Sequence, residues 1–279
     1  FIGVLAIFWL ALRARGARTA WLSAGLLALT MQWFVQSRFL TTDMVLAGCL
    51  TLGLCLFWRG VTTGLSRYYI LFYVCIALAT LSKGIIGFLL PGGIVFLFAL
   101  VTWRGPGKPG PRILREMQLP WGVPIFAAIV APWFVMVQVR IPQFMHYFII
   151  DQHVSRYASQ NAEHARPPWF FVPVVVLGFF PWIVHLAFLR ARDLRDGSGG
   201  ARADGAGQAP WAGQAPRAGQ APWAGQAPPL HLYLGLWFVV IFGFFSVSRG
   251  KLMSYVLPAF PPLAVLVAEL FARVLEGRE

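Results

Sequence analysis

Long apolar stretches separated by short polar connections run through most of the chain. The first covers Phe1 to Leu12, and the remaining stretches are Thr19 to Gln36, Met44 to Trp58, Tyr68 to Ser82, Ile85 to Trp103, Leu119 to Val139, Trp169 to Leu189, Leu232 to Val247 and Leu252 to Val274. Because these stretches are continuously apolar instead of alternating, they predict membrane-spanning helices and not barrel strands. Several are shorter than the roughly 20 residues of a typical span, so we expect them to tilt or to lie buried against neighbours.

The composition supports an integral membrane protein. Of the 279 residues, 58% are hydrophobic and 12% are charged, whereas soluble domains have about 25% charged residues. The net charge of +13 would also suit a nucleic-acid partner. We exclude that partner because the charges lie in the connections between apolar stretches, where positive loops are expected in any membrane protein.

The distribution of lysine and arginine predicts how the chain is oriented. Alternate connections hold 16 of the 23 basic residues, and these connections are therefore expected to face the cytoplasm. The other seven basic residues fall on the opposite, outer side, together with most of the histidines and with Asp43 and Asp151. Polar side chains gathered on one side of the spans are what an active site facing one compartment requires.

Two segments of the chain are not expected to form complete membrane-spanning helices. Phe1 to Leu12 is too short to span, so we interpret it as the tail of a span that begins upstream of Phe1. From Ala206 to Pro228 the pentapeptide Ala-Gly-Gln-Ala-Pro occurs four times, which predicts a disordered cytoplasmic linker. The expected organisation is transmembrane helices over residues 1–189, a low-complexity linker over 190–230 and C-terminal transmembrane helices over 231–279.

Two charged residues stand at the outer ends of neighbouring spans. Asp43 follows Thr41 and Thr42 at the start of one stretch, where an ionised carboxylate is costly unless it is paired or hydrated. The alternative is that one of these three residues is simply the N-cap of a helix. Lys83, followed by Gly84 in a tight turn, could meet a phosphate at the membrane surface, or it could snorkel and end its span.

The longest outer segment, residues 140–168, combines aromatic and titratable side chains and suggests an amphipathic helix lying on the membrane. Its candidate substrate-binding residues are Asp151, His153, Arg156 and His164. His153 and Arg156 share a helical face and could bind a phosphate. His153 and His164, with Asp151 or Glu163, could instead bind a divalent metal, although their spacing matches no standard motif. An ordinary interfacial helix is the remaining alternative.

A third outer turn adds two more cations. Arg249 and Lys251 flank Gly250, and Tyr255 follows in the next stretch together with three prolines. Proline inside a spanning helix indicates a kink or a broken helix, often beside a cavity. The cations of this turn, together with Lys83 and Arg156, suit a phosphate or pyrophosphate head group.

Four motifs occur in order on the outer side. They are Ser-Arg-Phe-x-Thr-Thr-Asp-Met from Ser37, Leu-Ser-Lys-Gly from Leu81, Asp-Gln-His-Val-x-Arg-Tyr with His-x-Arg-Pro-Pro-Trp from Asp151, and Ser-x-x-Lys-x-x-x-Tyr-x-Leu-Pro-x-Phe-Pro-Pro from Ser248. Each motif is weak alone. In this order they resemble the GT-C glycosyltransferases of families 39 and 83, the relatives of the lipid A aminoarabinose transferase and of protein O-mannosyltransferases. The resemblance covers nearly the whole chain except the repeats.

The resemblance implies an all-α, multi-span GT-C bundle with an outer interfacial helix, set in the bacterial inner membrane with its active site facing outward. It implies that Asp43 lines the site, that Lys83 contacts a lipid phosphate, and that the segment from Asp151 to His164 lies beside them. The principal acidic residue of the family would lie in an outer loop before Phe1. We therefore expect the primary catalytic carboxylate upstream of this chain, with Asp43 in a supporting role.

The leading hypothesis is transfer of a sugar from a polyprenyl-phosphate donor to a lipid, glycan or protein acceptor of the cell envelope. The outer cations would stabilise charge on the leaving phosphate, while a carboxylate takes the acceptor proton. The alternative is a transporter or flippase of a lipid-linked sugar, whose polar groups would lie nearer the middle of the bilayer. The expected partners are the donor, the acceptor and membrane lipids, without nucleic acid. A divalent metal is the one cofactor considered.

Overall fold

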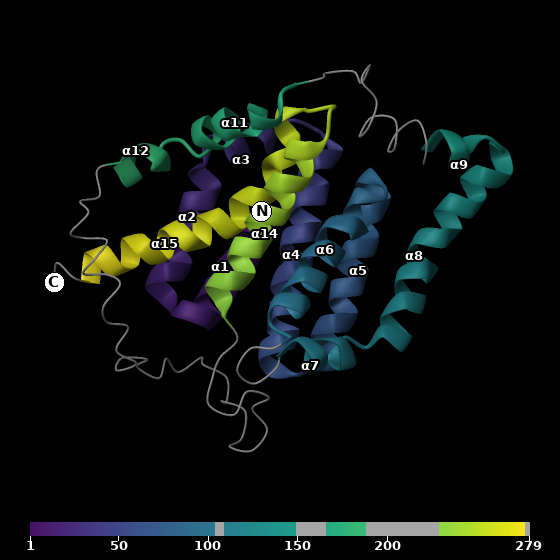
Figure 1. The fold of residues 1–279 in the computed structure, drawn as a ribbon, viewed down its shortest axis with the longest axis horizontal. Helices are drawn as coiled ribbons and strands as arrows, with labels where there is room; N and C mark the ends of the chain where they lie inside the picture. The colour runs from purple at the N-terminus through teal and green to yellow at the C-terminus, as the bar shows by residue number, and fades with distance from the viewer. Residues whose placement is uncertain (104–108, 149–165, 188–228, 277–279) are drawn as a thin grey trace.

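The computed structural model describes residues 1–103, 109–148, 166–187 and 229–276, which fold into helices and contain no β-strand (Figure 1). In chain order the helices are α1 (Ile2–Arg15), α2 (Ala17–Leu29), α3 (Met31–Gln36), α4 (Thr42–Thr63), α5 (Ser66–Lys83), α6 (Ile86–Val101), α7 (Pro109–Glu116), α8 (Leu119–Arg140), α9 (Phe144–His146), the 3₁₀-helix η2 (Pro168–Phe170), α11 (Phe171–Gly178), α12 (Trp182–Ala187), α14 (Leu230–Val247), the 3₁₀-helix η3 (Met253–Ala259) and α15 (Phe260–Glu276).

Within these ranges, four helical segments are long and apolar enough to cross a membrane: Thr42–Thr63, Leu119–Arg140, Leu230–Val247 and Met253–Leu275. Figure 1 shows α4, α5, α6 and α14 running between the same two ends of the molecule. We call the end with the start of α4 and the end of α5 the outer end, following the predicted orientation. The opposite end, where α4 ends and α5 starts, is called the inner end.

Aromatic side chains form the core where α4, α5 and α14 meet. Phe57, Tyr233 and Trp237 are fully buried there. The Tyr233 hydroxyl donates to the Leu54 carbonyl of α4 at 2.8 Å, and the Trp237 indole donates to the Pro258 carbonyl of η3 at 3.0 Å. Buried aromatic residues with polar tips need such partners. These two bonds therefore fix α14 against α4 and against η3.

A glycine brings α6 close to α5. Gly87 lies in the first turn of α6, and a Cβ atom placed on it would be 2.3 Å from the Thr80 nitrogen and 2.4 Å from the Ala79 carbonyl carbon of α5. Small residues allow this kind of close backbone approach between membrane helices. The end of α5, which carries Lys83, is thereby held against the start of α6.

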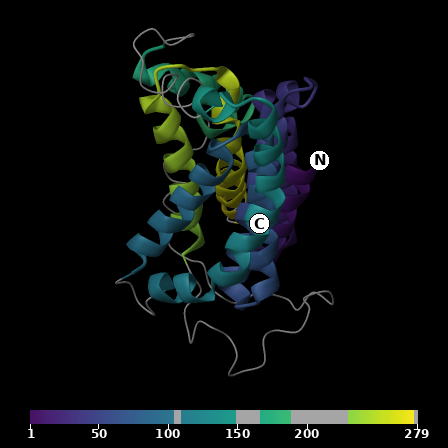
Figure 2. The ribbon, with the colours of Figure 1, turned by 90° about the vertical axis from the view of Figure 1, so that its right-hand side faces the viewer.

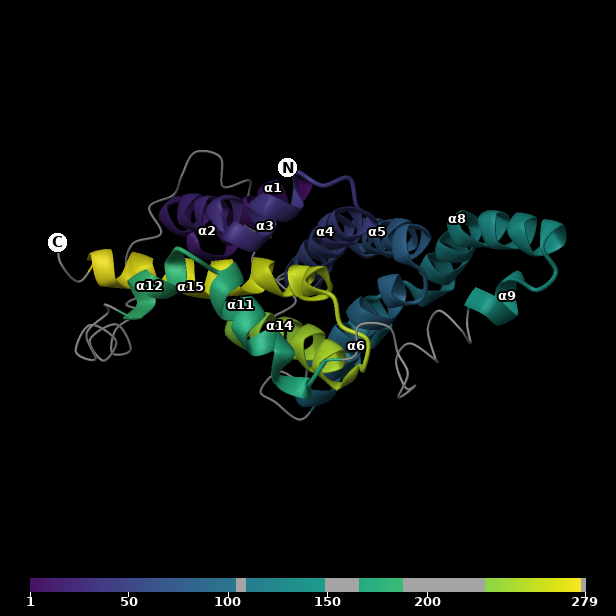
Figure 3. The same cartoon turned by 90° about the horizontal axis from the view of Figure 1, so that it is seen from above.

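Helix α8 stands at the edge of the bundle, beside α5 (Figure 3). Only Gly122 of this helix is buried, and large apolar side chains such as Trp121 and Val139 are exposed. An apolar helix with so little protein contact has the surface of a lipid-facing span. Figure 2 shows the short helix α7 lying across the inner end, between α6 and α8.

Two predicted spans are broken. The stretch Thr19 to Gln36 divides into α2 and α3, because Thr30 adopts an extended conformation between them. The stretch Trp169 to Leu189 was expected to be one spanning helix, and this is wrong: it consists of η2, α11 and α12, interrupted around Pro181. Figure 1 shows α11 and α12 following one another along the outer end. The Trp182 indole donates to the Leu26 carbonyl at 2.8 Å and holds them there.

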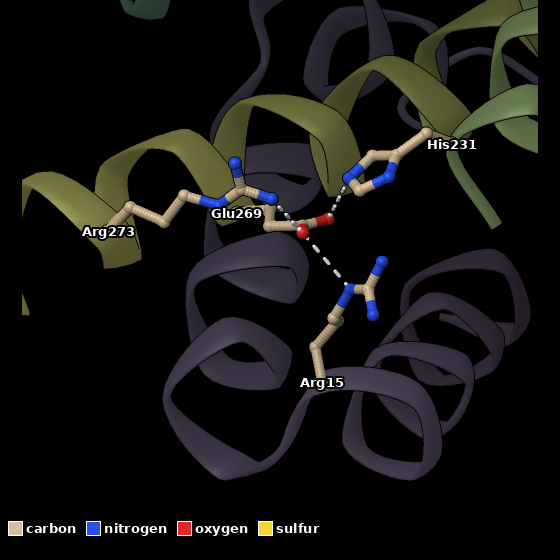
Figure 4. A network of polar contacts seen from close by, with 4 residues as sticks. All are labelled: Arg15, His231, Glu269 and Arg273. Atoms are coloured by element: carbon tan, nitrogen blue, oxygen red, sulfur yellow. Dashed lines mark hydrogen bonds and ion pairs between the residues drawn. The ribbon is translucent and has the colours of Figure 1, made fainter. Parts of the chain in front are cut away.

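A buried carboxylate joins three helices nearer the inner end (Figure 4). Glu269 of α15 is 6% exposed. Its oxygens lie 3.1 Å from Arg15 Nε of α1, 2.9 Å from His231 Nε2 of α14 and 2.7 Å from Arg273 Nη2, one turn further along α15. An acidic residue in an apolar helix requires such partners. This network was not anticipated from the sequence.

Candidate active site at the outer end

Asp43 and Lys83 form an ion pair between α4 and α5. Asp43 lies in the first turn of α4, after Thr41, which is the N-cap and makes no side-chain capping bond. The Asp43 carboxylate pairs with the Lys83 ammonium, and the two side chains are 14% and 20% exposed. Asp43 is thus not the N-cap, although its charge also suits a helix N-terminus. Two predicted site residues that lie 40 positions apart meet here.

The turn after Lys83 depends on a glycine. Gly84 has a φ angle of 77°, which residues with a Cβ atom rarely adopt, and its N–H donates to the Thr80 carbonyl at 2.7 Å. This ends α5 directly after Lys83 and leaves the ammonium at the edge of the bundle. The local sequence Lys-Gly therefore determines where the cation stands.

Tyr255 completes this group of residues. The Lys83 Nζ atom lies 4.4 Å from the centroid of the Tyr255 ring, within the range of a cation–π contact. Tyr255 belongs to η3, and Phe245 of α14 packs against its ring with centroids 5.2 Å apart. We call Asp43, Lys83 and Tyr255 the outer cluster. A lysine held between a carboxylate and an aromatic face is restricted in position and keeps ammonium protons to donate to an anion.

Lys251 was expected to be a cation available to a phosphate, but in the structure it is buried and bonded to backbone carbonyls. Its side chain donates to the carbonyls of Ser248 and, at 3.2 Å, of Arg166, and the residue is 3% exposed. The Arg166 N–H donates to the Arg249 carbonyl at 3.3 Å. Lys251 thus ties the start of η2 to the turn between α14 and η3. Burial also lowers the pKa of Lys251. Arg249 is exposed, and binding of substrate by either residue stays a prediction.

Replacing Lys251 with methionine is expected to lower stability by about 1–3 kcal/mol, because the carbonyl groups of Ser248 and Arg166 lose their donor. A thermal unfolding measurement on the purified protein in detergent would show this as a lower midpoint. The neighbouring substitution Arg249→Gln removes the same charge from an exposed side chain and should leave the midpoint within error. Equal midpoints for the two variants would contradict the tying role of Lys251.

The outer end contains a contact that the sequence analysis missed. The Gln32 amide of α3 donates to the Met253 carbonyl at the start of η3, at 3.2 Å. This bond places the start of η3 beside α3, two residues before Tyr255. A single glutamine at the end of an apolar stretch carries no signal that would have indicated it.

The remaining predicted site residues, Asp151, His153, Arg156 and His164, lie outside the described residues, as does Glu163. The interfacial helix is described only at its beginning, where α9 starts and where Phe144 and Phe148 stack with ring centroids 5.4 Å apart. In the described ranges, no three His, Cys, Asp or Glu side chains are grouped as a metal site would require. The metal site suggested for His153 and His164 therefore stays a prediction.

The chain resembles one protein family over its first half and related transferases over most of its length. Residues 1–148 match the family described as dolichyl-phosphate-mannose-protein mannosyltransferase. The undecaprenyl phosphate-alpha-4-amino-4-deoxy-L-arabinose arabinosyl transferase of Erwinia tasmaniensis is 28% identical over 96% of this chain and 43% of its own length. The protein of the same name from Aeromonas salmonicida is 30% identical over 76% of this chain and 32% of its own length.

Two crystal structures share the fold. ArnT from Cupriavidus metallidurans bound to undecaprenyl phosphate has a TM-score of 0.73 and 27% identity, over 99% of this chain and 46% of that protein. Its apo state has a TM-score of 0.71 and 26% identity. The chain thus spans less than half the length of these relatives. The similarity confirms the predicted fold class, an all-α membrane protein of the GT-C type.

Proposed function

Since the chain belongs to the dolichyl-phosphate-mannose-protein mannosyltransferase family, we propose that it acts in a membrane glycosyltransferase that uses a polyprenyl-phosphate sugar donor. The relatives reported above are named for undecaprenyl phosphate-linked aminoarabinose, which supports a donor of this chemical class. The acceptor would be a component of the cell envelope, such as lipid A, a polysaccharide or a protein. The setting would be the bacterial inner membrane, with the outer end facing away from the cytoplasm.

The outer cluster carries this proposal. The Lys83 ammonium is paired with Asp43 and lies over the ring of Tyr255, so its position is held from two sides. A lipid phosphate that enters at the membrane surface would meet this ammonium at the end of α5. The exposed Arg249, on the neighbouring turn, would add a second cation on the same side. Charged groups held in position before the substrate binds stabilise developing charge without reorganising.

The transfer step follows from this placement. The bond between the anomeric carbon and the phosphate oxygen breaks, and the phosphate keeps the electron pair. The acceptor oxygen attacks the anomeric carbon and gives its proton to a carboxylate. Lys83 would stabilise the added negative charge on the leaving phosphate. Asp43 would orient Lys83 or the acceptor, and a different carboxylate would accept the proton.

The experiment that tests the function compares transfer with transport. Membranes that contain the protein receive a polyprenyl-phosphate sugar labelled in the sugar. The label is followed into the envelope fraction, and the unlabelled polyprenyl phosphate that is released is quantified separately. We expect labelled acceptor and free polyprenyl phosphate to form in equal amounts. If intact donor crosses the bilayer of proteoliposomes without bond cleavage, the flippase alternative is correct and the proposal is wrong.

Tyr255 provides a graded test of the outer cluster. Tyr255→Leu removes the aromatic face under the ammonium and should lower transfer about 2- to 30-fold, since a cation–π contact is worth roughly 0.5–2 kcal/mol. Tyr255→Phe keeps the ring and should retain most of the activity. The measurement is the initial rate of transfer at low donor concentration. Equal rates for the leucine and phenylalanine variants would exclude the contact with Lys83 as a contribution to catalysis.

A further inference from the structure

Three arginines at the inner end pair with no carboxylate of the described residues. Arg13 lies in the last turn of α1, Arg59 near the end of α4 and Arg67 in the first turn of α5. In the described ranges, the carboxylates with ion pairs are Asp43, Glu116 and Glu269, and none of them pairs with these three arginines. The contrast with Arg15, two residues after Arg13 and paired with Glu269, shows that the lack of a counter-charge is local.

Two aromatic rings lie against two of these arginines, Arg59 and Arg67. The guanidinium carbon of Arg59 lies 5.7 Å from the Trp9 ring centroid and 5.8 Å from that of Tyr68, and that of Arg67 lies 5.1 Å from Tyr68. The two rings are themselves 6.0 Å apart. Arg59 is therefore shared between an indole of α1 and a phenol of α5. We call Trp9, Tyr68 and the three arginines the inner arginine cluster.

The positive charges of this cluster are not balanced by the side chains around them in the described residues. Arg59 is partly buried, and its Nε–H is buried without an acceptor, although a buried donor normally has one. Arg13 and Arg67 are exposed around it. Like charges this close destabilise one another unless an anion lies between them or they remain in water. Within the part of the chain that the structure describes, the cluster thus holds three positive charges without a paired carboxylate, and the guanidinium fork is well shaped for phosphate.

The surroundings indicate which anion is bound. Arg59 lies about 6 Å along the helix from Thr63, the end of α4, which corresponds to the level of lipid head groups when the helix spans. Toward the middle of the bundle, Leu5 and Leu71 are exposed, each one turn from Trp9 or Arg67 on the same helix face. Tyr68 lies in the first turn of α5 and packs against Trp9, and such aromatic residues are typical of the membrane interface. A ligand here would have an anionic head and apolar chains.

We propose that the inner arginine cluster binds the phosphate of an anionic phospholipid from the leaflet at the inner end. Arg59 and Arg67 contact the phosphate, Arg13 adds a third positive charge at the rim, and the acyl chains lie along the apolar surface that includes Leu5 and Leu71. The site is separate from the outer cluster and does not depend on the proposed transferase reaction. It explains why Arg59 and Arg67 lie against two aromatic rings while no carboxylate of the described residues pairs with them or with Arg13.

The test measures retention of phosphatidylglycerol by the purified, delipidated protein, by native mass spectrometry, with phosphatidylcholine as the uncharged reference lipid. We expect the wild-type protein to prefer phosphatidylglycerol. The double variant Arg59→Gln/Arg67→Gln should bind it about fivefold more weakly for each arginine removed. The double variant Arg38→Gln/Arg115→Gln is the matched control, because it removes the same charge from two exposed positions outside the cluster.

The outcomes distinguish lipid binding at a specific site from nonspecific attraction of anionic lipid to a positively charged surface. Equal losses in the two double variants, or no loss in the cluster variant, would overturn the proposal. Stronger retention of undecaprenyl phosphate than of phosphatidylglycerol would overturn the choice of lipid. If Arg59→Gln does not fold, Arg13→Gln/Arg67→Gln alters only exposed arginines of the cluster and carries the same expectation. Transfer activity should be retained in the variants of the inner arginine cluster when lipid is supplied.

Discussion

A protein with Lys83→Met is expected to lose sugar transfer by about two to three orders of magnitude while remaining folded. This is the size of effect seen when one group that stabilises developing negative charge is removed from an active site. Methionine has nearly the length of lysine and is tolerated in apolar surroundings. The loss should therefore reflect the missing ammonium at the end of α5 and not a cavity. The measurement is the initial rate of transfer from a labelled polyprenyl-phosphate sugar.

Variants of Asp43, the ion-pair partner of Lys83, distinguish a catalytic role of Lys83 from a structural one. Asp43→Asn leaves the ammonium without its counter-charge and should reduce both stability and transfer. In the double variant Asp43→Asn/Lys83→Met both charges are gone, and thermal stability should recover, because breaking a partly buried pair costs more than removing it entirely. Transfer should stay low. If transfer recovers together with stability, or if Lys83→Met alone is nearly fully active, Lys83 does not act on the lipid phosphate.

Gly87→Ala is expected to cost about 3 kcal/mol of stability and to reduce transfer as well. The added Cβ atom would meet the backbone of Ala79 and Thr80 at 2.3–2.4 Å, and a backbone cannot move aside as a side chain can. Helices α5 and α6 would have to separate, which is an overpacking cost at the upper end of the usual range. Because α5 ends at Lys83, the separation would also displace the ammonium from Tyr255. Thermal unfolding and initial rates would record both effects.

A second glycine in α6 provides the control. Gly92 has nothing within 4 Å of the position of an added Cβ atom. Gly92→Ala should therefore be neutral or stabilising by up to about 1 kcal/mol, since alanine favours a helix interior over glycine. The two substitutions are chemically identical and lie in the same helix. Equal unfolding midpoints would show that the close contact between α5 and α6 does not limit stability.

The part of the fold that was predictable from the sequence is the part that depends on hydrophobicity alone. The apolar stretches that became α4, α5, α6, α8 and α14 start and end within a few residues of their predicted limits. The broken stretches were not predictable in the same way. Thr30 interrupts a helix without proline or glycine nearby, and the stretch around Pro181 has the length and polarity of a span, although its helices lie along the outer end.

The candidate site shows a similar limit. Motif order placed Asp43, Lys83 and Tyr255 on one side of the membrane, but their contact depends on how α4, α5 and η3 pack. The role of Lys251 could not be predicted, because the amino-acid sequence does not distinguish a lysine that donates to two backbone carbonyls from one that binds a phosphate. Glu269 had a usable signal as an acidic residue in an apolar stretch. Its partners Arg15 and His231 lie far away in the chain, so no spacing pattern identified them.

The Glu269 network has a consequence for how the polypeptide can be divided. Arg15 belongs to the first described helix, while His231 and Glu269 belong to helices that follow residues 188–228. Contacts of α15 with α2 and of α14 with α6, and the Tyr233 hydrogen bond from α14 to α4, add to this connection. Two separately synthesised polypeptides, ending and beginning between residues 188 and 228, should therefore reassemble in one membrane. The peptide chain between them would then be a tether that raises local concentration, and not a requirement for assembly.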